Sequence, residues 1–322
     1  MELRFSVLQP EETLKTKLKG AVIGVGYLGR FHAQKIKASG QAELVGVFDF
    51  HKPQAEKISA ELGVKSYLSM NDVASEVDFV TVAASTQAHY EIAEFFLNKN
   101  IPVLVEKPIA ATAELGAKLC DLAEKNHVIF SVGHIERFNP AYDYLRQNSH
   151  KIKYLELNRL APFRTRGSDV SVLHDLMIHD LDLVNYIFKQ KIKSIIPFGQ
   201  KMIRPTIDDV SVLLTLESGI QVHIQNSRLT PQIVRNYRAV MDDRVILMNT
   251  ATSEADVLLP DETQPDLHKV EKWVVGKVDA LGLEIEHFIS AVKKEKPVAI
   301  TGREATAALK TIEEIVSQIE GV

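Results

Sequence analysis

The segment AVIGVGYLGR, residues 21–30, decides the first part of the fold. It opens with apolar, β-rich residues, and Gly24, Gly26 and Gly29 follow at the spacing G-x-G-x-x-G. Helix-forming residues then continue to about Ser39. A buried strand that turns at once into a helix needs glycines here, because the turn is tight and the helix packs close to the strand. The segment therefore predicts a strand, a sharp turn and a helix.

An acidic residue completes this pattern. Asp49 ends the next predicted strand, 20 residues beyond Gly29. Strand, glycine turn, helix and carboxylate together indicate a dinucleotide site. Gly26 lets a pyrophosphate approach the backbone N–H groups at the helix start, where Tyr27 and Leu28 lie, while Asp49 accepts bonds from the adenosine ribose. A carboxylate here repels a 2′-phosphate, so we expect NAD rather than NADP. The alternative is that the glycines serve only a tight turn.

The alternation of strand and helix continues through the first half of the chain. Further strand-like runs are residues 43–49, 77–84, 102–108 and 127–134. Unbroken apolar runs separated by helices are typical of a parallel sheet covered on both faces. We therefore predict a doubly wound parallel α/β domain over residues 19–145, preceded by a tail, residues 1–18, whose role the sequence does not indicate.

The second half of the chain has a different rhythm. Residues 151 to about 275 form mostly longer alternating segments, which are typical of antiparallel strands. Predicted helices span residues 173–188, 279–294 and 303–320. We expect residues 146–322 to form an α+β domain with a large, mostly antiparallel open sheet. Because no obvious helix covers one apolar face of that sheet, we expect a homodimer or homotetramer through it.

The composition excludes several classes of protein. The 322 residues are 45% hydrophobic and 25% charged, as in ordinary globular proteins. With 38 basic against 42 acidic residues and no dense basic stripe, we expect no nucleic-acid partner. A single cysteine, Cys120, excludes an intrachain disulfide and a Cys-based zinc site. Without a run of 18 apolar residues or a signal-like start, we expect a cytoplasmic protein with no membrane insertion.

The first candidate catalytic group is Glu106-Lys107-Pro108. It follows the apolar run PVLV, at the carboxyl end of a predicted strand, where open α/β sheets bind their ligands. We interpret Lys107 as reaching into that cleft. The alternative is a surface ion pair between Glu106 and Lys107.

The second group is HDLMIHDLDL, residues 174–183, on a predicted helix. Asp175, His179 and Asp182 recur at i, i+4 and i+7, which places them on one helical face. His179 can move a proton near neutral pH, and Asp175 can orient its ring. One alternative is a solvated acidic face. Another is a metal site of residues 174, 175, 179 and 180, which we disfavour because neighbouring helical side chains diverge; no metal is expected.

Four motifs, in order and in register, resemble the glucose-fructose oxidoreductase / inositol dehydrogenase / MocA family. They are the glycine fingerprint at 24–29, the triplet at 106–108, the segment 133–140 and Asp175-x-x-x-His179. The resemblance runs from about Lys19 to the end of the chain. It implies an N-terminal Rossmann domain, a C-terminal domain whose open sheet mediates dimers or tetramers, and NAD(P)-dependent oxidation or reduction of sugars and polyols.

The resemblance also implies roles for individual residues. Lys107 and His179 would be the catalytic pair, with Asp175 alongside. Arg137 and Asn139 would join them in binding the substrate. The implied cofactor contacts beyond the fingerprint and Asp49 are Ser85, Thr86, His89, Glu106 and Lys107. The segment Ala84-Ser85-Thr86-Gln87 lacks the proline usual for the family at this place.

Within the family, the segments ERFNPA and DLMIHDLDL are most similar to bacterial nucleotide-sugar 3-dehydrogenases, particularly those of UDP-N-acetylglucosamine. This likeness implies oxidation of the sugar C3 hydroxyl to a ketone, which feeds an aminotransferase in lipid A synthesis. Independently, Arg159, Arg164 and Arg166 form a cluster suited to a diphosphate, or else a solvated loop. The alternatives are a dehydrogenase of a free sugar or polyol, and a non-catalytic NAD(H)-binding sensor.

Overall fold

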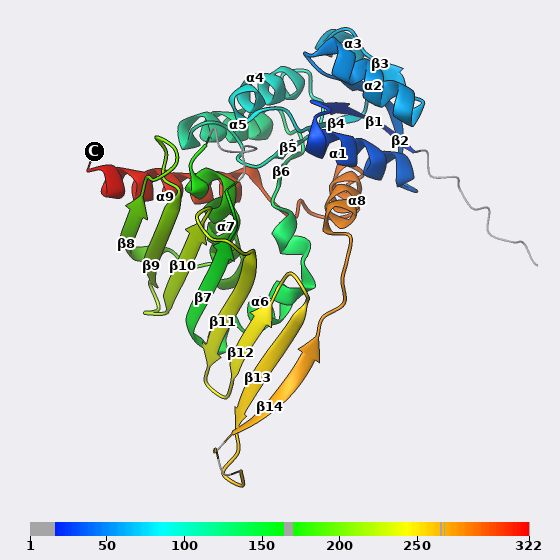
Figure 1. Ribbon diagram of the computed structural model, residues 1–322. Coiled ribbons are helices and arrows are strands. Elements are labelled where there is room, and N and C mark those ends of the chain that lie inside the picture. The colour runs from blue at the N-terminus through cyan, green and yellow to red at the C-terminus, as the bar shows by residue number, and fades with distance from the viewer. Residues whose placement is uncertain (1–16, 164–169, 265, 267, 322) are drawn as a thin grey trace, which may run out of the picture.

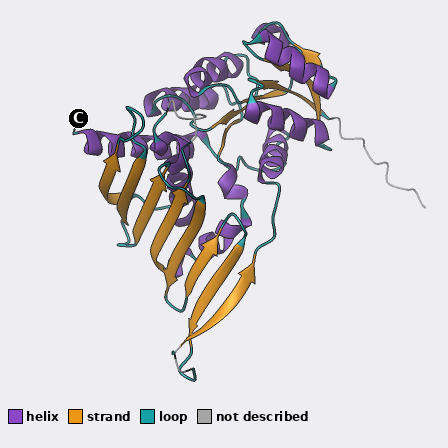
Figure 2. Cartoon of the chain, in the orientation of Figure 1, coloured by secondary structure: helices purple, strands orange, loops and turns teal. Residues whose placement is uncertain are grey.

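The computed structural model describes residues 17–163, 170–264, 266 and 268–321. Within these ranges the chain forms two sheets, with helices on both faces of the first and along one face of the second (Figure 1). Figure 2 shows the same division, with long strands gathered in the second sheet. Leu18, placed in the tail by the sequence pattern, already belongs to the first strand.

The first sheet is parallel and has the strand order β3-β2-β1-β4-β5-β6. Its strands are β1 (Leu18–Ile23), β2 (Ala42–Phe48), β3 (Lys65–Ser66), β4 (Phe79–Val82), β5 (Val103–Glu106) and β6 (Phe130–Gly133). Its helices are α1 (Tyr27–Ala38), α2 (Lys52–Leu62), α3 (Met70–Ala74), α4 (Thr86–Leu97) and α5 (Ala113–Lys125). The predicted doubly wound parallel sheet is confirmed; β3 and α3 are too short to show a period and were not predicted. Because the order reverses between β1 and β4, a crevice for ligands opens at the carboxyl ends of these strands.

Two glycines fix how closely α1 approaches the sheet. Gly24 has a φ of +80°, and a Cβ on it would lie 2.6 Å from the backbone nitrogen of Ala84. A Cβ on Gly29 would lie 1.8 Å from the carbonyl oxygen of Gly24. Neither position accepts another residue without movement of the backbone, so the sequence pattern here reports a real packing constraint.

The second sheet has the order β14-β13-β12-β11-β7-β10-β9-β8. Its strands are β7 (Ile152–Leu160), β8 (Ile192–Gln200), β9 (Asp209–Leu216), β10 (Gln221–Ser227), β11 (Val234–Met241), β12 (Val245–Asn249), β13 (Glu254–Pro260) and β14 (His268–Val274). Neighbouring strands are antiparallel except β7 and β10, which confirms the predicted mostly antiparallel sheet.

Helices cover only one face of this second sheet. The helices α6 (Asp143–Gln147) and α7 (Ile178–Phe188) lie behind the strands in Figure 1, and the face toward the viewer carries no helix in the described part of the chain. Short 3₁₀ turns, η1 (Ile135–Phe138), η2 (Pro140–Tyr142) and η3 (Ser149–Lys151), lead into the sheet. None of the described helices is long and apolar enough to cross a membrane.

The last two helices, α8 (Ala280–Val292) and α9 (Gly302–Glu320), pack against the first sheet and its helices, and α9 also packs against α7 and β8. On α8, Phe288 meets Phe79 of β4 edge to face, with ring centroids 5.8 Å apart. On α9, Glu313 accepts a hydrogen bond of 2.7 Å from the backbone N–H of Ala113. The helical pattern showed that these segments have an apolar face, but not which sheet would bury it. The sequence therefore assigned both to the second domain alone, whereas α8 packs against α1 of the first and α9 packs against elements of both.

We expect Phe288→Ala to lower the free energy of unfolding by about 3–5 kcal/mol, because it empties a buried aromatic site between α8 and the first sheet. The control is Leu283→Ala on the same helix, where a side chain of a residue 46% exposed is removed and the change should stay within about 0.5 kcal/mol. Urea unfolding measures both. Equal losses would contradict the docking of α8 described above.

Candidate active site

The start of α1 has the properties of an anion site. Gly26 is the N-cap of α1, no side chain caps the helix, and its first turn carries no acidic residue. A Cβ built on Gly26 would meet no atom within 4 Å, so the space beside the first N–H groups is open. The first turn of a helix offers N–H groups without intrahelical partners, and with open space beside them and the positive end of the helix they suit a phosphate. Tyr27 and Leu28, at the start of the helix, are exposed beside it.

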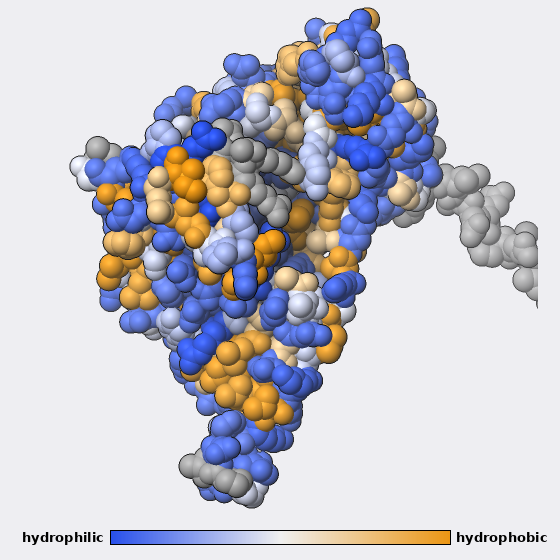
Figure 3. Space-filling model, in the orientation of Figure 1, coloured by the Kyte–Doolittle hydropathy of each residue, from blue (hydrophilic) through white to orange (hydrophobic). Residues whose placement is uncertain are grey.

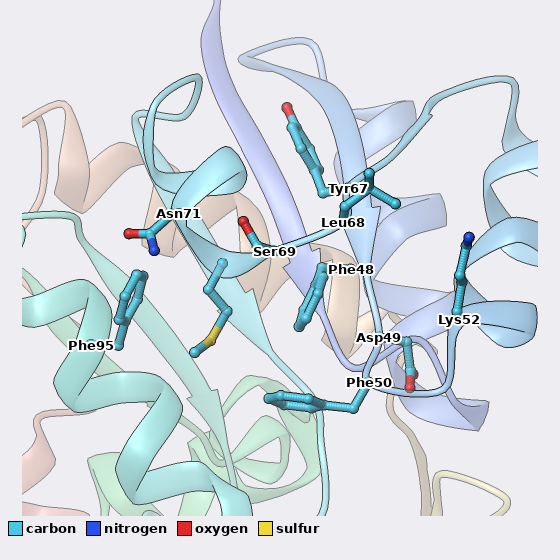
Figure 4. Close-up of a pocket in the computed structure, with 10 residues that line it drawn as sticks. Phe48, Asp49, Phe50, Lys52, Tyr67, Leu68, Ser69, Asn71 and Phe95 are labelled. Carbon is cyan, nitrogen blue, oxygen red and sulfur yellow. The ribbon is translucent and has the colours of Figure 1, made fainter.

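Asp49 holds the glycine turn in place. One carboxylate oxygen accepts a 2.8 Å hydrogen bond from the backbone N–H of Val25, and the other accepts one of 2.8 Å from His51. Each oxygen has a second lone pair for a ribose hydroxyl. Asp49 also borders a cavity of about 420 Å³ (Figure 4). Its walls are mostly apolar, with a few polar groups, and are formed by Phe48, Asp49, Phe50, Lys52, Tyr67, Leu68, Ser69, Met70, Asn71 and Phe95. Such a cavity suits a flat aromatic base.

Glu106, at the end of β5, is a buried anchor. His32 of α1 bonds one carboxylate oxygen through Nε2 at 2.9 Å, and the backbone N–H of Lys107 donates to the other at 3.2 Å. Burial raises the pKa of Glu106, but His32 and Lys107 outweigh it and hold the pKa below its usual value. The carboxylate therefore stays charged and fixes the backbone from which Lys107 projects; the peptide between Lys107 and Pro108 is cis.

The side chain of Lys107 extends from the end of β5 to the segment that precedes α7. Its Nζ donates to the backbone carbonyl of Asp175 at 2.9 Å and lies 3.4 Å from Oδ1 of the same residue. Asp175 belongs to a π turn, Leu173–Met177, that leads into α7. Such turns break the regular helical hydrogen-bonding pattern and are frequent at functional sites. Two of the predicted catalytic residues are thus in direct contact.

His179 lies in the first turn of α7; its side chain is partly buried, and its Nδ1 atom is shielded from solvent. Burial lowers the pKa of His179 well below its usual value, and the neighbouring cations Lys107, Arg159 and Arg235 lower it further. The imidazole is therefore neutral at neutral pH and able to accept a proton. Its Nδ1 has no hydrogen-bond partner among the described residues.

Asp175 and His179 share a cavity of about 470 Å³. Its other lining residues come from η1, β7, β11 and the adjoining loops: Ile135, Glu136, Arg159, Ala161, Pro162, Leu176, Arg228, Ile233 and Arg235. The structure therefore brings the three predicted catalytic residues, Lys107, Asp175 and His179, to one place. Of these lining residues, the sequence had not indicated Glu136, Arg228 or Arg235 as functional.

Other predicted substrate contacts lie elsewhere. Arg137 is buried and forks onto both carboxylate oxygens of Asp182, at 2.8 and 2.7 Å, and does not line the cavity. Asn139 accepts a hydrogen bond from the N–H of Ala141 at the start of η2. Asp182, expected to share a face with Asp175 and His179, faces Arg137 instead. Arg164 and Arg166 lie outside the described residues.

The predicted cofactor contacts after β4 divide in a similar way. Ser85 is the N-cap of α4 but makes no capping bond with its side chain, and Thr86 begins the helix. His89 is buried, with Nδ1 2.8 Å from the carbonyl oxygen of Pro108 and Nε2 3.1 Å from that of Ala84. Burial lowers the pKa of His89, so the neutral ring donates to one carbonyl at a time. His89 thus ties α4 to the loop that carries Lys107.

Two further findings concern the alternative of a metal site, and neither of them supports it. In the described part of the chain, no group of three or more His, Cys, Asp or Glu side chains is placed to hold a metal ion. His174, part of the metal alternative, has Nδ1 2.8 Å from the hydroxyl of Ser171.

Comparison with known proteins agrees with this geometry. Residues 18–134 match the oxidoreductase family with an NAD-binding Rossmann fold, GFO_IDH_MocA, and residues 133–244 match the GFO/IDH/MocA C-terminal domain. The chain belongs to this family. It is therefore an NAD-dependent oxidoreductase, and the open N-terminus of α1, Asp49 and the cavity beside it fit the pyrophosphate, ribose and adenine of NAD.

Two relatives cover nearly the whole chain. The UDP-N-acetylglucosamine 3-dehydrogenase of Acidithiobacillus ferrooxidans is 34% identical over 298 residues, which is 90% of this chain and 95% of that protein. A solved structure of that enzyme superposes with a TM-score of 0.88, covering 95% of this chain and 99% of the other at 31% identity. The inositol 2-dehydrogenase of Rhizobium meliloti is 25% identical, covering 89% of this chain and 92% of that protein.

Two glycine variants separate folding from NAD binding. We expect Gly29→Ala to destabilise the protein by about 2 kcal/mol, because its methyl group overlaps the carbonyl oxygen of Gly24. Gly26→Ala should leave the melting temperature without ligand almost unchanged but weaken NAD binding about tenfold or more, because its methyl group enters the space for the pyrophosphate. Thermal unfolding with and without NAD, and calorimetric titration, measure both. Normal NAD affinity in Gly26→Ala would show that the phosphates bind elsewhere.

Proposed function

We propose that this protein oxidises a hydroxyl group of a nucleotide sugar to a ketone, with the C3 hydroxyl of UDP-N-acetylglucosamine as its substrate group. The observation that carries the proposal is a cavity lined by Asp175, neutral His179 and a cationic wall, in which Asp175 also accepts a hydrogen bond from Lys107. The likeness to the Acidithiobacillus ferrooxidans enzyme over nearly the full length of both chains supports this choice of substrate.

The residues divide the work of oxidation as follows. The substrate hydroxyl lies between Lys107 Nζ and the ring of His179. Lys107, held by Asp175, donates a hydrogen bond to the hydroxyl oxygen and stabilises the negative charge that develops there. Neutral His179 takes the hydroxyl proton as general base, and a carbonyl group forms at the carbon. Bound NAD supplies the hydride acceptor for the hydrogen on that carbon.

The burial of His179 suits the role of base. A histidine whose pKa lies well below its usual value is neutral before the substrate arrives, so no proton has to leave it first. Lys107 is less suited to this step, because it already donates to Asp175. His179 as the proton acceptor and Lys107 as the positioning donor is therefore the assignment that we propose.

Two other functions remain to be compared. A dehydrogenase of a free polyol would agree with the inositol dehydrogenase relatives, several of which are 24–29% identical to this chain. It would leave the cationic wall of the cavity without a purpose. A non-catalytic NAD(H) sensor would have no need of a cavity lined by Asp175 and neutral His179, with Lys107 bonded to Asp175.

We further propose the setting of the reaction. A sugar ketone is the substrate of an aminotransferase, which would convert it to the amine. For the C3 ketone of UDP-N-acetylglucosamine, the product would enter the synthesis of amide-linked lipid A. We therefore propose that the protein works in the cytoplasm, where nucleotide sugars and NAD are both available.

The test is oxidation by the purified protein with NAD, followed by NADH absorbance and by mass spectrometry of the product. We expect turnover with UDP-N-acetylglucosamine to exceed that with UDP-glucose, N-acetylglucosamine and myo-inositol. His179→Ala should lower kcat by about 10²- to 10⁴-fold with NAD affinity unchanged, because only the general base is lost. A higher kcat/KM for myo-inositol than for any nucleotide sugar would overturn the proposal, and full turnover in His179→Ala would overturn the role of that residue.

We also propose that the open face of the second sheet joins copies of the chain. Ile196 and Phe198 of β8 and Leu247 of β12 are exposed on it. Figure 3 shows hydrophobic residues gathered over the lower strands and along the β8 edge of this face. An exposed apolar face of this kind favours a symmetric dimer or tetramer.

Light scattering tests this assembly. We expect the wild-type protein to be a dimer or tetramer and Phe198→Asp with Leu247→Asp to weaken it, because a buried charge at the interface is costly. The double variant should keep its far-ultraviolet circular dichroism. A wild-type monomer at micromolar concentration would contradict the proposal.

A further inference from the structure

The arginines around the substrate cavity differ in whether other groups of the protein neutralise their charge. Three arginines line it: Arg159, Arg228 and Arg235. Arg159 is buried and shared between Asp180 at 3.0 Å and Glu136 at 2.8 Å. Arg159, which belongs to the cluster that the sequence suggested for a diphosphate, is therefore already paired with two carboxylates.

Arg228 is also held by the protein. Its Nη2 donates to the carbonyl oxygen of Val170 at 2.8 Å, and its Nε lies 3.9 Å from Asp208. Asp208 in turn accepts three backbone N–H bonds from residues 202–204, which fix its position. Arg228 thus closes a structural bridge between β10 and the chain before the π turn.

Arg235 differs from both. In the sheet it lies directly opposite Arg159, because β11 and β7 are neighbouring strands. Alternate residues of a strand point to the same face, so Arg235 faces the same helix-covered side as buried Tyr237 and Ala239, where the cavity lies. Its side chain is exposed at the cavity wall, and its guanidinium forms no hydrogen bond or ion pair with any described residue. Two cations directly opposite each other repel, which makes an unpaired Arg235 at this position unfavourable in the free protein.

The effect of Arg235 reaches the catalytic histidine. Its charge lowers the pKa of His179, and it also lowers the pKa of Glu136 on the far wall. The positive charge of Arg235 therefore acts on His179, the residue that accepts the substrate proton. A planar guanidinium with free N–H groups matches the geometry of a phosphate oxygen pair better than any other side chain.

We infer that Arg235 binds the diphosphate of the nucleotide-sugar substrate, and that it is the uncommitted cation of the described cavity wall. This inference rests on the proposed function, in that it needs a substrate with an anionic group. It separates the arginines into two classes: Arg159 and Arg228 build the cavity, and Arg235 recognises what enters it.

Binding of an anion at Arg235 has a consequence for the reaction. The negative charge offsets the repulsion between Arg235 and Arg159, and it removes part of the positive potential at His179. The bound substrate then makes His179 a stronger base than it is in the free protein. A neutral polyol would bring no such change.

The experiment compares the NAD-loaded wild type with Arg235→Ala, Arg235→Lys and Lys153→Ala. Lys153 is a cation near the other end of β7, about 20 Å along the strand from Arg159, and it pairs with Asp242. The readouts are KM and kcat for UDP-N-acetylglucosamine, and the affinity for UDP by calorimetry. UDP carries the diphosphate without the sugar, so it reports the anion site separately from oxidation.

We expect Arg235→Ala to raise KM and weaken UDP binding by about 10- to 100-fold, the effect of losing a charged hydrogen bond. Arg235→Lys should retain part of the affinity, because it keeps the charge but not the fork. Lys153→Ala should match the wild type. The circular dichroism of Arg235→Ala should be unchanged and its melting temperature should not fall, since the removed side chain is exposed and lies opposite Arg159.

The outcomes distinguish this inference from the proposed function. If the wild type binds UDP and Arg235→Ala binds it equally well, the role of Arg235 is wrong even when UDP-N-acetylglucosamine is oxidised. If the wild type binds no UDP, the diphosphate site itself is wrong. If UDP binding depends on Arg235 but no nucleotide sugar is oxidised, the anion site stands and the proposed reaction fails.

Discussion

The buried charge of Glu106 is the constraint on which the active site depends. A carboxylate without water must be met by hydrogen-bond donors, and these come from His32 on α1 and from the backbone of Lys107. The pairing locks the first helix to the end of β5 and sets the direction of the Lys107 side chain. That side chain then reaches Asp175, so one buried charge organises the contact between the two sheets.

Glu284 of α8 is a second buried carboxyl group, and it shows what happens when such a group lacks hydrogen-bond donors. It is buried close to Glu106 and Asp182, and neither of its carboxyl oxygens has a partner among the described residues. Burial and the two neighbouring carboxylates raise the pKa of Glu284 well above its usual value, so it remains a neutral acid. Glu106 thus stays charged because His32 and the backbone N–H of Lys107 bond it, whereas Glu284 stays neutral because it has no hydrogen-bond partner among the described residues.

Charge pairing also places α7. Successive acidic residues on this helix turn to different partners, Asp180 to Arg159 of β7 and Asp182 to Arg137 of η1. The two pairs anchor the helix on both sides and leave His179 between them, facing the cavity without a charged partner. A buried ion pair adds little net stability, but breaking it is costly, so these pairs fix the geometry of His179 more than they strengthen the fold.

The sequence by itself determined the glycine turn, Asp49 and the two kinds of sheet, and it singled out Lys107, Asp175 and His179 as candidate catalytic residues, because these follow from local spacing and strand ends. The tertiary structure alone decided which arginines face the cavity. Arg137 and Arg159 are buried against carboxylates far away in the chain, while Arg235 stands opposite Arg159 only because β11 pairs with β7 in that register. It also decided that α8 packs against α1 and that α9 packs against both α5 and α7. Both outcomes depend on contacts between segments distant in sequence, and a local pattern shows that a residue is charged or apolar but not what will neutralise or cover it.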